Sequence, residues 1–144
     1  IEEASRKRFI YAYKEQSSFS TVDFVKRAIT YFGYAPQTIQ TDNGGEFRHT
    51  AKTKRVHPLE LFCQKNGIIH KTIRPRTPWH NGKVERSHRS DQERFYNHLR
   101  FYSLADLQIQ MKRYLRRSNN IPMSVLGWKS PSLRHLELSS ARNI

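Results

Sequence analysis

The stretch Thr38-Ile39-Gln40-Thr41-Asp42-Asn43-Gly44-Gly45-Glu46-Phe47 joins a short strand pattern to a turn that contains an acid and two glycines. β-branched residues dominate its first part, which favours a strand that ends by presenting Asp42 at the edge of a sheet. The glycines allow a backbone with positive φ and keep bulk away from a group that approaches the acid. One interpretation is an active-site carboxylate that meets a metal ion or a phosphate. The other is an ordinary Asn-Gly turn after a strand, and this stretch alone leaves both open.

The composition indicates a single basic domain with a polyanionic partner. The chain has 144 residues, and its 26 Lys and Arg against 12 Asp and Glu give a formal net charge of +14. Such a charge favours nucleic acid as the partner. No apolar run reaches the roughly 20 residues that span a bilayer, so no membrane partner is expected. One cysteine, Cys63, excludes an internal disulfide and a paired-thiolate zinc site, and it favours a reducing, cytoplasmic compartment.

The rest of the chain alternates strand and helix patterns. Strands are predicted over residues 8–13, 38–41 and 68–73, and helices over residues 20–32, 58–65, 81–99 and 103–119, with one short helix near the end. In this pattern Cys63 lies in the core, and His88 packs on the apolar face of its helix. The order predicts an α/β layered sheet, with the strand directions left open.

Glu85 is the second acid whose surroundings point to function. It lies near the start of the predicted helix 81–99, in the cation-rich stretch Trp79-His80-Asn81-Gly82-Lys83-Val84-Glu85-Arg86-Ser87-His88-Arg89. The structural alternative is an i, i+4 ion pair with Arg89, which stabilises a helix by about 0.2–0.5 kcal/mol.

Three blocks of sequence resemble the DDE-type integrase/transposase catalytic core shared by bacterial insertion-sequence transposases and retroviral integrases. They are residues 41–47, residues 74–89 and residues 121–131, and residues 1–6 look like the family's second-strand segment. The resemblance implies an RNase H-like mixed sheet with flanking helices. It also implies that residues 1–120 form the catalytic core, that residues 121–144 form its C-terminal tail, and that Asp42 and Glu85 are the family's second and third acids.

Two departures from the family pattern concern spacing and the first acid. The gap between Asp42 and Glu85 is longer than usual, and the basic loop at residues 48–57 accounts for it. The family places its first acid on the strand before the one that residues 1–5 resemble. We therefore expect the chain, which starts at Ile1, to be a fragment that lacks the first strand and is inactive without an upstream Asp. Glu2 and Glu3 are not candidates for that role.

The resemblance implies DNA transposition or integration by metal-dependent phosphoryl transfer. Asp42 and Glu85 would be both catalytic residues and metal ligands, because carboxylate oxygens suit Mg²⁺ or Mn²⁺. Two ions about 4 Å apart would serve end cleavage by water and strand transfer by a 3′-OH. The expected DNA-binding residues, each with a solvated side chain as the alternative, are His80, Asn81, Lys83, Arg86 and Arg89.

The expected partners are double-stranded DNA, as element ends and as target, and further copies of the chain in a homo-oligomer. The expected location is the nucleoid of a bacterial cytoplasm. A zinc set built from His49, His57, Cys63 and His70 is not expected, because their spacing matches no usual pattern. The alternative function is a catalytically inactive DNA-binding or assembly module of the same fold.

Overall fold

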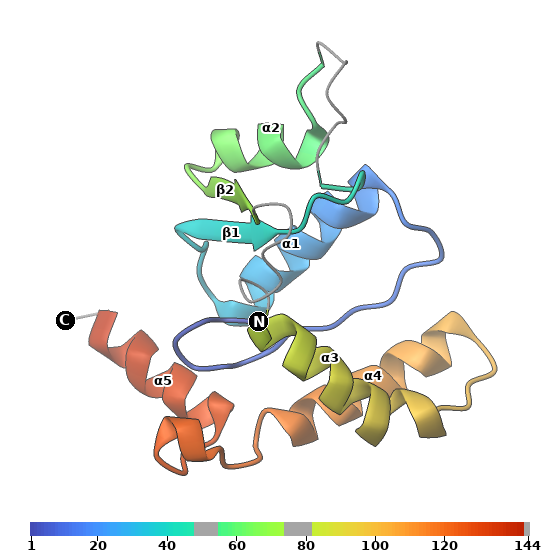
Figure 1. Cartoon of the computed structure of the whole chain (residues 1–144), viewed down its shortest axis with the longest axis vertical. Helices are drawn as coiled ribbons and strands as arrows, with labels where there is room; N and C mark the ends of the chain where they lie inside the picture. The colour runs from blue at the N-terminus through green and yellow to red at the C-terminus, as the bar shows by residue number, and fades with distance from the viewer. Residues whose placement is uncertain (48–54, 74–81, 143–144) are drawn as a thin grey trace. The chain divides into compact units, whose positions relative to one another are not determined.

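The computed structural model describes residues 1–47, 55–73 and 82–142 (Figure 1). The chain divides into two compact units, one formed by Tyr13–Arg89 and the other by Ile1–Ala12 with Ser90–Ile144. We call the first the sheet unit and the second the helical unit. Helix α3 (Gly82–Arg94) begins in the first and ends in the second.

The described sheet consists of two parallel strands. β1 (Thr38–Thr41) pairs with β2 (Ile69–Thr72), in a register that runs from Thr38 opposite Ile69 to Thr41 opposite Thr72. Parallel neighbours need a crossover connection, and α2 (Pro58–Lys65) lies within it. Both strands were predicted, and Figure 1 shows them side by side. Because both strands run in the same direction, their carboxyl ends lie at the same end of the sheet. Asp42 comes directly after β1 at that end.

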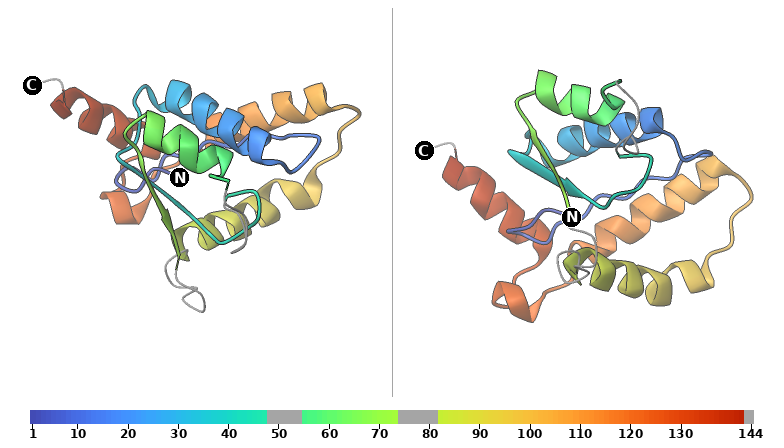
Figure 2. Two further views of the ribbon diagram at one scale, coloured as in Figure 1. Left: turned by 90° about the horizontal axis from the view of Figure 1, so that it is seen from above. Right: turned by 45° about the horizontal axis from the view of Figure 1, so that its top comes forward.

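Apolar side chains from α1 (Ser18–Phe32), α2 and the residue just before β2 form the core of the sheet unit. Its buried members are Val25, Leu59, Cys63 and Ile68. Both views of Figure 2 show α1 beside α2, in agreement with the contacts between them. The prediction that Cys63 lies in the core is therefore confirmed.

The limits of α1 follow local chemistry. Its N-cap is Ser17, whose Oγ accepts a hydrogen bond from the Ser20 N–H at 3.1 Å, so the helix begins before the predicted Ser20. It ends at Gly33, whose φ of 80° lies in the left-handed region and whose N–H donates to the Ile29 carbonyl at 2.9 Å. This left-handed C-cap explains the glycine, and the predicted end is confirmed.

A buried histidine caps α2. The Nδ1 of His57 accepts a hydrogen bond from the Leu59 N–H at 3.2 Å, and its Nε2 lies 3.0 Å from the Ser18 Oγ. Because Nδ1 accepts from a backbone N–H, it carries no proton, so Nε2 is the protonated nitrogen and donates to Ser18. His57 thereby joins the first turns of α1 and α2.

The helical unit contains α4 (Leu104–Ser118), α5 (Pro131–Arg142), the 3₁₀ turns η2 (Tyr96–His98) and η3 (Ser124–Leu126), and the last part of α3. The predicted start of α4 is confirmed, because the Ser103 Oγ accepts a hydrogen bond from the Asp106 N–H at 3.1 Å. Met111 and Leu115 are the buried apolar residues of α4. The short helix predicted near the end is α5.

A polar cluster lies inside the helical unit. The Arg8 Nη1 is 2.5 Å from the Asp91 Oδ1, with side-chain exposures of 12% and 5%, and the Tyr114 hydroxyl donates to the same oxygen at 2.7 Å. The Phe95 ring stacks on Tyr114 with ring centres 4.6 Å apart. Asp91 is thus the residue of α3 that is buried, whereas His88 is exposed, so the predicted packing of His88 is wrong.

Two further predictions fail at the ends of segments. The helix predicted over 81–99 ends at Arg94, because Phe95 (φ −134°, ψ −63°) leaves the helical conformation and the chain continues as η2. Residues 8–13 form no strand. The backbone of Arg8 is instead bonded by the Asn119 side chain, whose Oδ1 accepts from the Arg8 N–H at 3.0 Å and whose Nδ2 donates to the Arg8 carbonyl at 2.9 Å. A side-chain amide thus takes the place of a neighbouring strand.

Candidate active site

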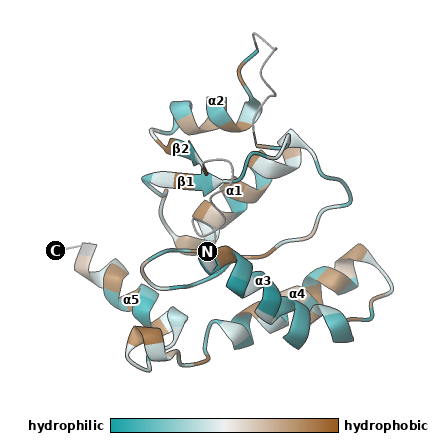
Figure 3. Cartoon of the chain, in the orientation of Figure 1, coloured by the Kyte–Doolittle hydropathy of each residue, from teal (hydrophilic) through white to brown (hydrophobic). Residues whose placement is uncertain are grey.

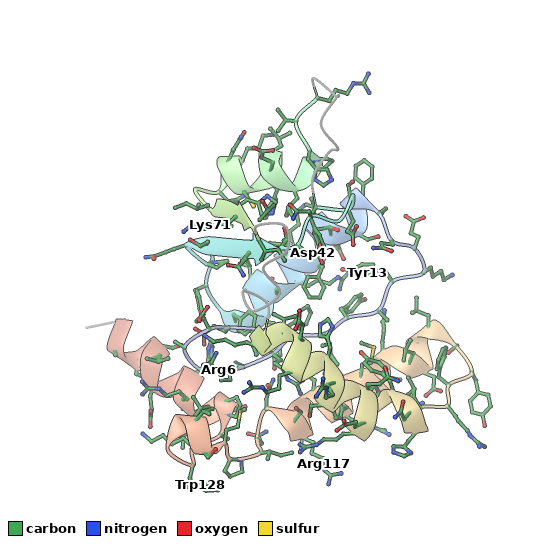
Figure 4. All side chains as sticks on the ribbon, viewed as in Figure 1. Arg6, Tyr13, Asp42, Lys71, Arg117 and Trp128 are labelled. Atoms are coloured by element: carbon green, nitrogen blue, oxygen red, sulfur yellow. The ribbon has the colours of Figure 1, made fainter. Side chains whose placement is uncertain are left out.

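Asp42 follows β1 at the edge where both strands end. The sheet pairing continues past the strands, because the Ile73 N–H donates to the Thr41 carbonyl at 3.0 Å. The Asn43 Nδ2 then donates to the Ile73 carbonyl at 3.0 Å. The turn that carries Asp42 is therefore fastened to the continuation of β2, and Figure 4 shows Asp42 labelled at the end of β1.

The Asp42 carboxylate is exposed, and its orientation is set by one backbone hydrogen bond. Its Oδ1 accepts from the Gly44 N–H at 2.9 Å, which forms an Asx turn. The other carboxylate oxygen receives no described hydrogen bond among residues 1–47, 55–73 and 82–142. The two interpretations of this stretch are therefore compatible: the turn is real, and it holds an acid with a lone-pair face open to a ligand.

A short hydrogen-bonded chain supports the backbone of Asp42. The Thr41 Oγ1 donates to the Asp42 carbonyl at 3.0 Å and lies 2.9 Å from the His70 Nε2. Because the Thr41 hydroxyl has a single proton, it accepts from His70, so the Nε2 of His70 is the protonated nitrogen. His70 thus stabilises the end of β1 from the neighbouring strand.

Neither glycine of the turn has a left-handed backbone, and only Gly44 has a close neighbour at the position that a Cβ would take. Positive φ occurs at Gly33, Gly67 and Gly127 among the described glycines, so the expected positive φ at Gly44 and Gly45 is wrong. A Cβ on Gly44 would lie 2.6 Å from the Glu46 Oε2, and the Gln16 amide donates a hydrogen bond to the same carboxylate. The Glu46 side chain folds over Gly44 and occupies the room that a larger residue would take.

Glu85 lies in the first turn of α3 and is exposed. Its position favours a negative charge, because the N-terminal end of a helix is electropositive. In the part of the chain that the structure describes, no ion pair joins Glu85 to Arg89, so the structural alternative for Glu85 is absent there.

Three of the predicted DNA-binding residues, Lys83, Arg86 and Arg89, are exposed on α3 beside Glu85. Figure 3 colours nearly the whole of this helix as hydrophilic. His80 and Asn81 lie outside the described residues, as do residues 74–81 that lead from β2 to α3. Among the described residues, no contact joins Asp42 to Glu85. The turn after β1 positions Asp42, and α3 positions Glu85.

The donor chemistry of the two acids fits a hard divalent cation, because each offers carboxylate oxygens that are exposed. Within residues 1–47, 55–73 and 82–142, however, no three His, Cys, Asp or Glu side chains gather into a group that could hold a metal ion. The described residues thus supply separate ligands rather than a complete set.

Glu2 has a structural role. Its carboxylate accepts hydrogen bonds from the backbone N–H groups of Ala4 at 3.2 Å and Ser5 at 3.0 Å, which closes a turn where a strand end was expected. Burial alone would raise the pKa of this carboxyl, but the hydrogen bonds from Ser5 and Ala4 outweigh it and hold the pKa below its ordinary value.

Comparisons with known proteins agree on one family. Residues 1–78 match one model described as an integrase core domain, and residues 66–131 match a second model with the same description. The ORF3 protein of Spiroplasma virus SpV1-C74, which is named as an integrase, is 32% identical over 124 residues that cover 79% of this chain. The chain spans 34% of that viral protein.

Solved structures show the same fold. The catalytic core domain of BIV integrase superposes with a TM-score of 0.73 at 20% identity, over 97% of this chain and 84% of that one. The HTLV-2 integrase catalytic core domain in complex with magnesium, in a trimeric form, gives a TM-score of 0.59 at 22% identity, over 85% of this chain and 72% of that one. The RNase H-like fold is therefore confirmed. No described helix has the length and apolar character needed to cross a membrane.

Proposed function

Since this chain belongs to the integrase core domain family, the DDE-type integrase and transposase cores, we propose that it is the catalytic core of an enzyme that moves DNA by phosphoryl transfer. The observation that carries the proposal is the exposed Asp42 carboxylate, held at the common edge of two parallel strands by the Gly44 N–H. Ligand and catalytic groups of α/β sheets commonly lie at the carboxyl ends of strands.

In this proposal Asp42 and Glu85 are the catalytic acids and the metal ligands. Bound Mg²⁺ or Mn²⁺, two ions in the complete site, would activate the attacking oxygen and stabilise the leaving one at phosphorus. The Asx turn fixes one oxygen of Asp42 before any ligand arrives, which lowers the ordering cost of binding. The magnesium complex of the HTLV-2 integrase core supports the choice of metal.

The cations on α3 would hold the DNA backbone next to Glu85. We propose Lys83, Arg86 and Arg89 for this role, together with His80 and Asn81 from the preceding segment. Phosphate contacts of this kind fix the register of the nucleic acid without reading its sequence. The net charge of +14 adds a long-range attraction that speeds association with DNA.

Two acids do not complete the site of this family, so we expect the chain to be inactive until a third carboxylate is supplied. The attacking groups would be water at an element end and the freed 3′-OH at the target, and no side chain need become covalently attached. Joining two ends requires more than one catalytic core, so a homo-oligomer is proposed, in line with the trimeric form of the HTLV-2 core. The nucleoid of a bacterial cytoplasm is the proposed location.

A second candidate is an inactive DNA-binding or assembly module of the same fold. One observation favours it, namely that the described residues contain no group of three metal-ligating side chains. The two candidates differ in what Asp42 and Glu85 do. The module needs neither carboxylate, whereas the enzyme needs both.

The test compares charge-removing variants in the complete protein. Asp42→Asn and Glu85→Gln preserve side-chain shape but remove a charged ligand, so each should abolish cleavage and joining of a labelled DNA end while duplex binding is retained. Lys83→Ala and Arg86→Ala should instead weaken binding and leave slow chemistry at saturating DNA. A folded Glu85→Gln protein that cleaves at close to the native rate with Mg²⁺ would replace the enzyme by the inactive module.

A further inference from the structure

Four exposed cations lie within six consecutive positions near the end of α4, outside the residues discussed above as DNA-binding. They are Lys112, Arg113, Arg116 and Arg117. We call this set the α4 basic face. Figure 4 labels Arg117 and shows its side chain pointing away from the ribbon of α4.

These cations lie opposite the face by which α4 packs. Successive residues of an α-helix are about 100° apart around its axis, so the four cations project from α4 within an arc of about 140°. The buried residues Met111 and Leu115 point to the other side of the helix, and the Tyr114 hydroxyl is bonded to Asp91. The apolar side of α4 is therefore already used, and its basic side is left open to a partner.

Helix stability does not account for the α4 basic face. Arg116 and Arg117 lie in the last turn, where cations favour the helix dipole. Lys112 and Arg113 precede that turn, and each has a like charge four positions later, an arrangement that destabilises a helix by a few tenths of a kcal/mol per pair. The like-charge pairs therefore lower the stability of α4, and folding alone does not explain why they are present.

Acids do not neutralise the α4 basic face within the part of the chain that the structure describes, since no ion pair involves any of its four side chains. The acid of α4, Asp106, accepts hydrogen bonds from the Tyr102 N–H and the Gln110 amide at the other end of the helix. By contrast, Lys129 and Arg134 both pair with Glu137, at 2.5 Å and 3.0 Å. Unlike the charges of Lys129 and Arg134, those of the α4 basic face are therefore not offset by an ion pair with a described acid.

We propose that the α4 basic face binds the phosphate backbone of duplex DNA, as a second set of phosphate contacts made by other residues than the cations of α3. The inference rests on the proposed function, from which it takes DNA as the partner. The four residues rise over about 7.5 Å of helix, a length over which duplex DNA carries about four negative charges. Such contacts hold any sequence, so this surface suits target DNA or the flank of an element end.

An anionic membrane is a poorer fit to the same charges. A helix that binds the surface of a bilayer inserts a large apolar face. In α4 that face is packed inside the helical unit, and Ile109 is the exposed apolar residue that precedes the cations on their side. Charge complementarity without an apolar face favours a hydrated polyanion, which duplex DNA is.

The experiment measures how salt weakens the binding of the chain to a labelled random-sequence duplex. The test variant is Arg113→Gln with Arg117→Gln. The matched control is Lys129→Gln with Arg134→Gln, which changes the net charge equally at cations that already pair with Glu137. A third variant, Lys83→Gln with Arg86→Gln, reports on α3. Circular dichroism and the thermal midpoint of each variant verify that it is folded.

We expect the test variant to lower the slope of log affinity against log salt by about one to two and to weaken binding about tenfold or more, since each phosphate contact contributes about 0.9 to that slope. The control should change the slope by less than half as much. A test variant that binds with the native slope, or no worse than the control, overturns the inference. Loss of binding to vesicles of anionic lipid with DNA binding intact also overturns it.

The proposed function fails in a different way. If the native chain does not bind duplex DNA at low salt, the choice of DNA for both surfaces is wrong. If the α3 variant loses binding while the α4 variant does not, the proposed function stands and the α4 surface alone is rejected.

Discussion

Asp42 and Asp91 show how the same side chain serves two different purposes in the two units. Asp42 follows a strand, is exposed, and receives one described hydrogen bond, from the Gly44 N–H. Asp91 is buried within α3, where Arg8 and Tyr114 both bind its Oδ1. A backbone N–H orients Asp42 and leaves one of its oxygens open to a ligand, whereas side chains of the protein bind Asp91. Partners, rather than the mere presence of a carboxylate, separate a candidate catalytic acid from a structural one.

The largest expected effect separates the two acids by stability. Asp91→Asn leaves the buried Arg8 guanidinium without its counter-charge, and breaking a buried ion pair costs about 3–5 kcal/mol. Asp42→Asn changes an exposed position and should alter the free energy of unfolding by less than about 0.5 kcal/mol. Urea unfolding followed by circular dichroism measures both. Equal losses in the two variants would remove the distinction between the acids.

The second largest effect is expected at Asn119, whose side-chain amide bonds the Arg8 backbone in place of a neighbouring strand. Asn119→Ala removes both hydrogen bonds to the Arg8 backbone at a site that is 1% exposed. Each buried backbone group left without a partner costs about 1–3 kcal/mol, so the loss should reach about 2–4 kcal/mol. Asn119→Asp keeps the acceptor and loses the donor, so it serves as the matched variant.

Hydrogen exchange at the Arg8 amide supplies the local readout for these two variants. The amide should be protected in the native chain and exposed to exchange in Asn119→Ala. In Asn119→Asp the acceptor remains, so protection should be retained more fully. Unchanged protection in Asn119→Ala would show that another group holds this backbone.

Elements whose ends carry local signals could be predicted from the sequence. The Ser103 cap, Pro58 at the start of α2 and the left-handed Gly33 act on residues within one turn, so each is visible in a short window. Asp42 was found in the same way, because the strand pattern and the turn adjoin it.

Features that depend on distant partners could not be predicted. The segment 8–13 has the composition of a strand, but the partner of its Arg8 backbone is a side chain 111 residues away. On α3 the sequence pattern placed His88 inside, but His88 is exposed and the buried residue is the acid Asp91, whose partners Arg8 and Tyr114 come from distant parts of the chain. His57 gave no signal as a cap, because its two hydrogen bonds require α1 and α2 to be already packed.

The smallest expected effect concerns Asp23, an acid whose surroundings are intermediate between those of Asp42 and Asp91. The Tyr13 hydroxyl donates to its Oδ2 at 2.6 Å, and the Arg27 Nε donates to the same oxygen at 2.6 Å. These hydrogen bonds, that of Tyr13 first, hold the pKa of Asp23 below its ordinary value. The side chain is exposed enough for solvent to weaken both contacts, so the stability at stake is small.

Burial and the hydrogen bond to Asp23 raise the pKa of Tyr13 to about 12. An unfolded tyrosine titrates near about 10, so between these values the folded chain holds the proton that the unfolded chain has released. Stability contributed by this contact is therefore complete below about pH 10 and falls as the pH rises from about 10 to 12.

Tyr13→Phe should remove that part of the alkaline loss of stability, whereas Tyr102→Phe, at a tyrosine that is 99% exposed, should leave it unchanged. Thermal midpoints of the three proteins across this range measure the difference. An alkaline loss of equal size in native and Tyr13→Phe chains would mean that the Tyr13–Asp23 contact carries no stability, which would leave Asp23 with the exposed acids, beside Asp42, rather than with Asp91.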